Sequence, residues 1–129
     1  MNPSLDVKLA QMLLVGFRGA TPGECAPFLE RLSRCPVGGV WLTDADSPMG
    51  RVPGNIRSPD QLETLIAALQ ACVPIPLLIA IDAEGGQVIR LKEAYGFPAF
   101  PSARKLGDRD DPAWTHREAG RLAATLHAL

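Results

Sequence analysis

The feature that most constrains the fold of this sequence is an unbroken apolar run, Leu77-Leu78-Ile79-Ala80-Ile81, which ends at Asp82. A run of this length with no alternation of apolar and polar residues is typical of a parallel strand that is buried on both faces. Two further apolar runs, each interrupted by glycine, precede it, at residues 13–17 and 36–42. Segments with helical spacing of apolar residues separate the three runs. The alternation predicts a parallel sheet with right-handed crossovers.

Helices are expected between and after these strands. The clearest helix start is Ser58-Pro59-Asp60-Gln61, in which Ser58 can cap the helix, Pro59 fits its first position and Gln61 can reach back. A second start is expected at Thr21-Pro22-Gly23-Glu24. Further helices are expected at residues 6–12 and from residue 110 to residue 126. Periodicity does not choose between a β/α barrel and an open doubly wound sheet.

Composition and charge narrow the classes of partner. The chain has 129 residues, a hydrophobic fraction of 47% and a formal net charge of −1, which describe one ordinary globular domain. Near-neutral charge gives no electrostatic reason to expect binding to nucleic acid or to an anionic membrane. The sequence has no signal-peptide pattern at its start and no apolar run long enough to span a bilayer. A cytoplasmic location is therefore expected.

No cofactor or metal ion is expected. The three cysteines match no metal or redox spacing, and His116 and His127, eleven residues apart, do not have the spacing of metal ligands. No glycine-rich phosphate-binding pattern follows a strand.

Polar side chains follow each of the three expected strands. In both candidate architectures ligands bind beyond the carboxyl ends of the strands, so these side chains are the candidates for a binding site. They are Arg18 after the first strand, Asp44 and Asp46 after the second, and Asp82, Glu84 and Arg90 after the third.

The segment from Asp82 to Arg90 carries most of the functional information. A carboxylate at the end of a buried strand gains from hydrogen-bonding a ligand hydroxyl, and Gly85-Gly86 permits a loop folded tightly against a ligand. Arg90 can then return over the site as a donor of several hydrogen bonds. The alternative is a tight turn in which Asp82 or Glu84 accepts hydrogen bonds from loop N–H groups and Arg90 is a surface charge.

The segment from Ile81 to Leu91 resembles the D-x-E-G-G-x-V-x-R-[LF] loop of family 3 glycoside hydrolases, with Gln87 where many relatives have arginine. Other segments resemble the family in order and spacing: residues 9–17, 38–42, 55–62, 100–103 and 118–120. The family's catalytic domain is a β/α barrel. The resemblance therefore implies an α/β fold in which residues 1–129 form part of a (β/α)8 TIM barrel, about three of its eight units. The barrel is expected to be truncated before strand four.

The resemblance also implies a function, that of an exo-acting, retaining β-N-acetylhexosaminidase. Its substrate would be a carbohydrate with a terminal N-acetylglucosamine, for which peptidoglycan fragments are one source. Asp82 would accept hydrogen bonds from sugar hydroxyls and Arg90 would donate to the sugar. The family's aspartate nucleophile and its His–Asp acid/base pair are expected beyond Leu129, so the chain alone is expected to be inactive.

Two other interpretations remain open. One is the β-glucosidase branch of the same family, because the His-containing loop that separates the branches has no counterpart in this sequence. The other is a small non-catalytic binding domain with a flavodoxin-like sheet, which the length suits. Phosphoacceptor versions of that domain have an acidic pair after strand one, where this chain has Arg18-Gly19.

Overall fold

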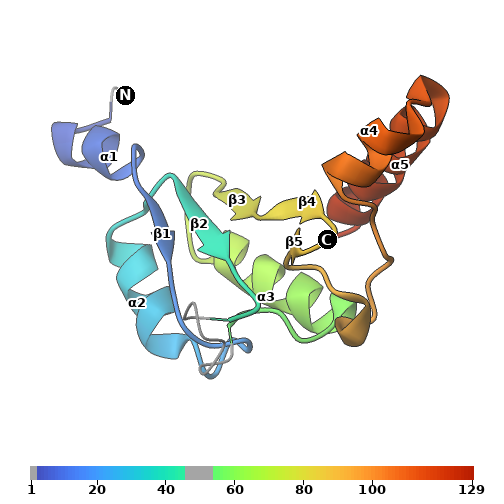
Figure 1. Cartoon of the computed structure of the whole chain (residues 1–129). Helices are drawn as coiled ribbons and strands as arrows, with labels where there is room; N and C mark the ends of the chain where they lie inside the picture. The colour runs from blue at the N-terminus through green and yellow to red at the C-terminus, as the bar shows by residue number, and fades with distance from the viewer. Residues whose placement is uncertain (1–2, 46–53) are drawn as a thin grey trace.

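The computed structural model describes residues 3–45 and 54–129, which form a mixed α/β fold (Figure 1). Its helices and strands, in chain order, are α1 (Leu5–Ala10), β1 (Leu14–Gly16), α2 (Ala26–Arg34), β2 (Gly39–Leu42), α3 (Pro59–Ala71), β3 (Leu78–Ile81), β4 (Ala83–Gly85), β5 (Val88–Ile89), the 3-10 helix η1 (Glu93–Tyr95), α4 (Ala103–Arg109) and α5 (Pro112–His127). None of the described helices is both long enough and apolar enough to cross a membrane.

The first three strands form a parallel sheet in the order β1-β2-β3, as the alternation of apolar runs predicts. The register aligns Val15 with Val40 and Val40 with Ile79. All three carboxyl ends therefore lie at one edge of the sheet, where the candidate site residues follow. Each strand begins after the start of its apolar run, and β1 also stops one residue before the end of its run.

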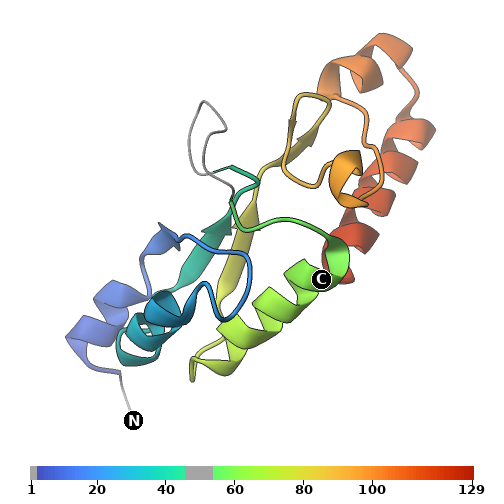
Figure 2. The same cartoon turned by 90° about the horizontal axis from the view of Figure 1, so that it is seen from below.

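Helices α2 and α3 cover one face of this sheet (Figures 1 and 2). The buried side of α3 consists of Leu62, Leu65 and Leu69, each 0% exposed, and these residues share one core cluster with Val40 of β2. The start of α3 matches the prediction, since the Ser58 hydroxyl accepts a hydrogen bond from the Gln61 N–H at 3.2 Å. The apolar stripe at helical spacing is thus what attaches α3 to the sheet.

The predicted start of the second helix was wrong by about one turn. Helix α2 begins at Ala26, and residues 21–25 form a turn in front of it. Pro27 explains the shift: it has no N–H, so it cannot donate the hydrogen bond that would continue a helix begun at Pro22. Pro27 instead occupies the first turn of α2, where helices tolerate proline.

The prediction that residues 77–81 form a strand buried on both faces was also wrong for this chain. The strand is parallel, as predicted, but β3 is an edge strand and Leu78 is 73% exposed. Leu78 lies on the sheet face opposite α2 and α3. Leu14 and Trp41 on the same face are 52% and 46% exposed. We call these three residues the open apolar face.

We expect this open apolar face and the two sheet edges to make the isolated chain self-associate. Apolar edge strands without charged residues template pairing between chains. Size-exclusion chromatography with light scattering should show oligomers or aggregates, and Leu78→Lys should shift the population toward monomer. Met12→Lys is the matched control, because Met12 is 81% exposed but lies outside the sheet. A clean wild-type monomer with a sharp two-state melting transition would instead favour a complete small domain.

The remainder of the chain begins beyond the carboxyl edge of the sheet, and α5 returns to the core, against which Leu122 and Leu129 pack. Strands β4 and β5 pair antiparallel as a short hairpin, where the sequence had predicted only a loop. Helix α5 begins at Pro112, as expected. Asp111 caps this helix, because its carboxylate accepts a hydrogen bond from the Trp114 N–H at 2.9 Å. Helix α4 was not predicted. Figure 1 shows α4 and α5 at the end of the molecule opposite to α1.

Candidate functional site

Asp82 and Arg90, the two predicted binding residues, lie at the base of the β4–β5 hairpin and contact each other. The N–H of Arg90 donates to the carbonyl of Asp82 at 2.9 Å, which closes the hairpin. Their side chains form an ion pair, with Arg90 Nη2 at 3.0 Å and Nε at 3.3 Å from Asp82 Oδ2. Both side chains are 33% exposed, so the pair remains accessible to a ligand.

Asp44 and Lys92 complete a cluster of four charged residues. Arg90 Nη1 lies 3.3 Å from Asp44 Oδ1, and Lys92 Nζ pairs with Asp44 Oδ2. The Asp44 side chain is only 3% exposed, whereas that of Lys92 is 44% exposed. A buried carboxylate needs partners of opposite charge to offset its lost hydration, and here two cations supply them. Two carboxylates and two cations make the cluster formally neutral.

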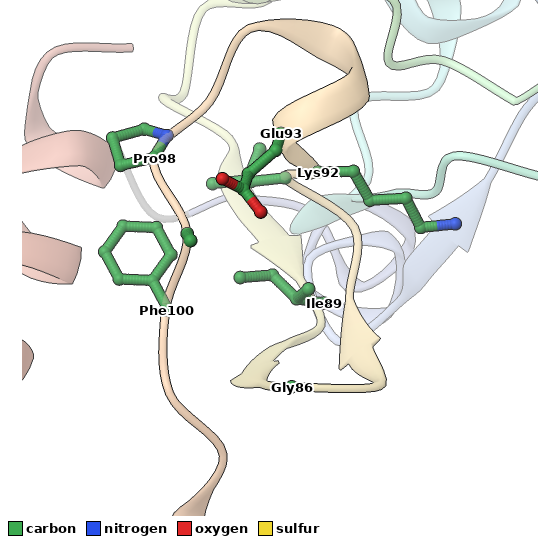
Figure 3. A pocket seen from close by; sticks show the side chains of 8 residues that line it. Gly86, Ile89, Lys92, Glu93, Pro98 and Phe100 are labelled. Carbon is green, nitrogen blue, oxygen red and sulfur yellow. The ribbon is translucent and has the colours of Figure 1, made fainter.

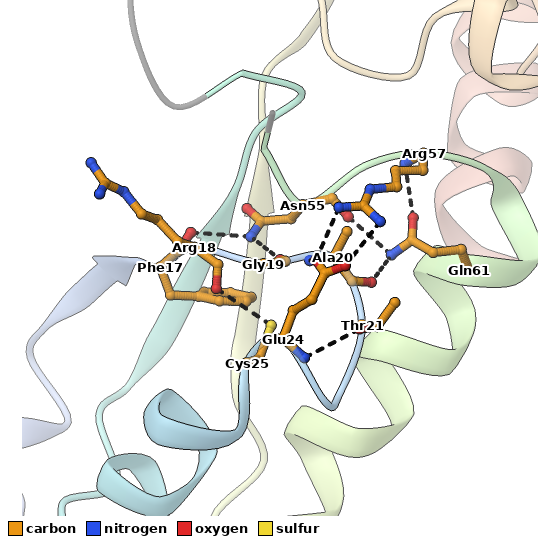
Figure 4. A network of polar contacts seen from close by, with 10 residues as sticks. All are labelled: Phe17, Arg18, Gly19, Ala20, Thr21, Glu24, Cys25, Asn55, Arg57 and Gln61. Atoms are coloured by element: carbon orange, nitrogen blue, oxygen red, sulfur yellow. Dashed lines mark hydrogen bonds and ion pairs between the residues drawn. The ribbon is translucent and has the colours of Figure 1, made fainter. Parts of the chain in front are cut away.

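The other predicted candidates lie elsewhere. Glu84 is exposed on β4, and Arg18 is exposed after β1 with its side chain directed away from Glu24 and Arg57 (Figure 4). Asp46 falls outside the described residues. Within residues 3–45 and 54–129, no group of three or more His, Cys, Asp or Glu side chains is placed to hold a metal ion.

The paired glycines of the loop lie close to another segment of the chain, residues 100–102. Gly85 and Gly86 have positive φ angles of 83° and 61°. A Cβ atom on Gly85 would lie 2.1 Å from the Pro101 carbonyl oxygen, and one on Gly86 would lie 2.6 Å from Ser102 Cβ. The Gly86 N–H also donates to the Phe100 carbonyl at 3.1 Å. The glycines therefore attach the hairpin to residues 100–102, which fixes the loop between Asp82 and Arg90.

A hollow of about 250 Å³ lies between the hairpin and this segment. Its apolar lining includes Ile89, Leu91 and Phe100. Figure 3 shows the Glu93 carboxylate between Phe100 and Ile89, and the Lys92 side chain directed away from the hollow. Lys92 lines the hollow, while its Nζ atom pairs with Asp44 in the charged cluster.

A second polar network, drawn in Figure 4, holds the ends of β1 and β2 together. Asn55, which is 0% exposed, donates to the carbonyls of Phe17 at 3.1 Å and Gly19 at 2.8 Å, and it accepts from the Thr43 N–H at 3.2 Å. Its own N–H donates to the Thr43 carbonyl at 2.7 Å. Because Thr43 precedes Asp44, Asn55 supports the backbone that carries the buried carboxylate.

An ion pair closes the outer side of this network. Both carboxylate oxygens of Glu24 pair with Arg57, at 2.9 and 3.1 Å, and one also accepts from the Ala20 N–H at 2.9 Å. The Ala20 N–H and the Arg57 guanidinium hold the pKa of Glu24 below its ordinary value. Gln61 joins the same group: its side chain accepts from the Arg57 N–H at 2.8 Å and donates to the carbonyl of Asn55 at 3.0 Å. Burial raises the pKa of the nearby Cys25 thiol.

We expect Asn55→Ala to lower the free energy of unfolding by about 3 kcal/mol, because it leaves buried backbone groups without hydrogen-bond partners. Urea denaturation followed by circular dichroism measures the change. Thr64→Ala is the matched control, since Thr64 makes one exposed hydrogen bond to the Asp60 carbonyl and its loss should cost less than about 0.5 kcal/mol. Equal midpoints for the two variants would contradict the role of Asn55.

Sequence reasoning missed Lys92 and the bridging role of Asn55. A signal for Lys92 was present: it lies two residues after Arg90, and in extended chain such residues point to the same side. Asn55 carried no such signal, since its partners lie 12 to 38 residues earlier in the chain.

Comparison with known proteins identifies the family. Residues 4–128 match the glycosyl hydrolase family 3 N terminal domain. The chain belongs to glycosyl hydrolase family 3. The family 3 resemblance of the Asp82–Arg90 loop is therefore confirmed, and the match extends over nearly all of the described residues.

Individual relatives agree with this assignment. A β-hexosaminidase of Pseudomonas aeruginosa is 37% identical over 98 residues, which cover 69% of this chain and 29% of that protein. A β-hexosaminidase of Nitrosomonas eutropha is 46% identical over 81 residues, which cover 63% of this chain and 20% of that protein. The family 3 chain thus spans less than a third of the length of these relatives.

Solved structures of family 3 proteins have a similar fold. A β-N-acetylglucosaminidase from Paenibacillus sp. FPU-7 aligns with 98% of this chain at a TM-score of 0.82 and 28% identity, and the alignment covers 22% of that protein. NagZ from Neisseria gonorrhoeae aligns with 76% of this chain at a TM-score of 0.59 and 28% identity, covering 26% of that protein. The arrangement of helices and parallel strands described above is therefore that of a segment of family 3 proteins.

Proposed function

We propose that this chain is the sugar-binding N-terminal part of a β-N-acetylhexosaminidase barrel. The observation that carries the proposal is the ion pair between Asp82 and Arg90 at the carboxyl edge of a parallel sheet, on the loop that identifies the family. Ligands of α/β barrels bind at this edge. The β-N-acetylglucosaminidase from Paenibacillus sp. FPU-7, together with the β-hexosaminidase relatives, supports the choice of N-acetylglucosamine over glucose as the terminal sugar.

The geometry of the pair suits a hydroxylated ligand. Among residues 3–45 and 54–129, the hydrogen bonds to the Asp82 carboxylate all reach Oδ2, which leaves Oδ1 to accept from a sugar hydroxyl. The guanidinium of Arg90, whose side chain is 33% exposed, lies 3.0 Å from Oδ2 of the same carboxylate, so a donor and an acceptor lie close together. Charge-assisted hydrogen bonds of this kind are about twice as strong as neutral ones.

The open apolar face supports the same proposal. In a closed barrel the inward-facing side chains of all strands pack against one another in layers. Leu14, Trp41 and Leu78 are large apolar residues on the face where such layers form, yet α2 and α3 cover only the opposite face. We therefore propose that these three strands are the first three of an eight-stranded barrel.

A chimeric enzyme tests the proposed function. Residues 1–129 would replace the matching N-terminal segment of the Pseudomonas aeruginosa β-hexosaminidase. We expect the chimera to hydrolyse a chromogenic N-acetyl-β-glucosaminide, and to prefer it to the matching β-glucoside. The remainder of the relative, expressed alone, is the negative control. A soluble, folded chimera that prefers the β-glucoside would favour the β-glucosidase branch instead, and one inert toward both sugars would contradict the proposal.

A further inference from the structure

The guanidinium of Arg90 is held by two carboxylates that come from different loops of the chain. Its Nε and Nη2 atoms donate to Asp82 Oδ2, on the loop after β3, and Nη1 donates to Asp44 Oδ1, on the loop after β2. Asp44 lies 46 residues before Arg90 in the chain. A planar guanidinium contacted along two of its edges has little freedom to rotate. The orientation of Arg90 therefore depends on both strand ends.

The two carboxylates differ in what else they can do. Asp82 is 33% exposed and can contact a ligand, whereas Asp44 is 3% exposed. Asp44 also divides its two oxygen atoms between cations, with Oδ1 toward Arg90 and Oδ2 toward Lys92. A buried carboxylate shared in this way acts on a ligand only through the cations that it holds.

We propose that Asp44 is a positioning residue that sets the orientation of the Arg90 guanidinium for the sugar. Lys92 shares the Asp44 carboxylate and thereby weakens the attraction between Asp44 and Arg90. The proposal deepens the proposed sugar-binding role of Asp82 and Arg90 and rests on it. Without Asp44, Arg90 keeps only the single oxygen of Asp82 as an anchor. Without Lys92, Asp44 holds Arg90 alone and the guanidinium stays in place.

Chemical modification of arginine in the 129-residue chain tests this inference. Phenylglyoxal reacts with accessible guanidinium groups, and mass spectrometry of the digested protein gives a rate for each arginine at low protein concentration. Arg104, whose side chain is 90% exposed, is the internal reference in the same sample. We expect Arg90 to react more slowly than Arg104 in the wild-type chain.

Different modification rates of Arg90 in two variants separate positioning by Asp44 from a general structural role of the cluster. Asp44→Asn should raise the modification rate of Arg90 on the order of tenfold, the factor that corresponds to one lost charge-assisted hydrogen bond. Lys92→Met should leave the rate unchanged or lower it. Glu30→Gln is the matched control, since it removes an exposed carboxylate 2.7 Å from Arg34 and should affect neither Arg90 nor the reference Arg104. An unchanged Arg90 rate in Asp44→Asn would overturn the inference, and so would an equal rise in both cluster variants.

Protection by N-acetylglucosamine distinguishes this inference from the proposed function. We expect the sugar to slow modification of Arg90 in the wild-type chain and to protect it less in Asp44→Asn. Equal protection in the two proteins would overturn the positioning role while the sugar site stands. Absence of protection in the wild-type chain, with the rate effect of Asp44→Asn retained, would count against the sugar site, and the orientation of Arg90 by Asp44 would stand by itself.

Discussion

The purified 129-residue chain is expected not to hydrolyse chromogenic N-acetyl-β-glucosaminides. The family resemblance assigns the aspartate nucleophile and the His–Asp acid/base pair to segments that this chain does not contain. Acid/base assistance alone contributes roughly 10² to 10⁴ in rate, and the nucleophile splits one difficult step into two easier ones. A site that only binds the sugar gives neither effect. Release of the chromophore should therefore equal that of a blank without protein.

The measurement needs a control for contaminating host glycosidases. Asp82→Ala, purified by the same procedure, would carry the same contaminants as the wild-type chain. Residual activity that is equal in both preparations belongs to the contaminants. Turnover that survives rigorous purification and disappears in Asp82→Ala would contradict the prediction, because it would require catalytic groups within these 129 residues.

The second large effect is expected for Asp82→Ala in the chimeric enzyme described above. If the Asp82 carboxylate binds sugar hydroxyls more tightly in the transition state than in the ground state, its loss should cost on the order of 2–4 kcal/mol in kcat/KM. This corresponds to a loss of roughly 30- to 1000-fold. Steady-state kinetics with a chromogenic substrate gives the value directly.

Two further substitutions sharpen that experiment. Arg90→Ala should mainly raise KM, because a donor to the bound sugar contributes to the ground state and the transition state alike. Glu84→Ala is the matched control, since Glu84 is an exposed carboxylate on the same hairpin, and it should keep the parental kinetics. Parental kcat/KM in both Asp82→Ala and Arg90→Ala would mean that the ion pair only stabilises the hairpin.

Features that depend on neighbouring residues were determined by the sequence itself. Ser58 caps α3 because its hydroxyl reaches the N–H three residues later, whatever surrounds the helix. The parallel order of the three strands follows from the helical segments that separate them, since a crossover of that length returns the chain in the same direction. Asp82 was identifiable as a candidate because the apolar run before it ends abruptly at a carboxylate.

Other features were decided only by the tertiary structure, because they depend on which distant segments meet. The turn before α2 is one such case: Glu24 looked like a residue of a helix start, yet its carboxylate pairs with Arg57, 33 residues later, across the network at the ends of β1 and β2. The approach of the Gly85-Gly86 turn to Pro101 and Ser102 is another.

The charged cluster shows both contributions at one site. The loop motif alone placed Asp82 and Arg90 eight residues apart on one turn, so their meeting was predictable. That Asp44 also reaches Arg90 follows from the pairing of β2 with β3, which brings the two strand ends together. Burial of Asp44 then favours the second cation, Lys92, because cations offset the hydration that a buried carboxylate has lost. Which cation pairs with Asp44 therefore depends on the packing that buries Asp44, and not on the residues next to Asp44 in the sequence.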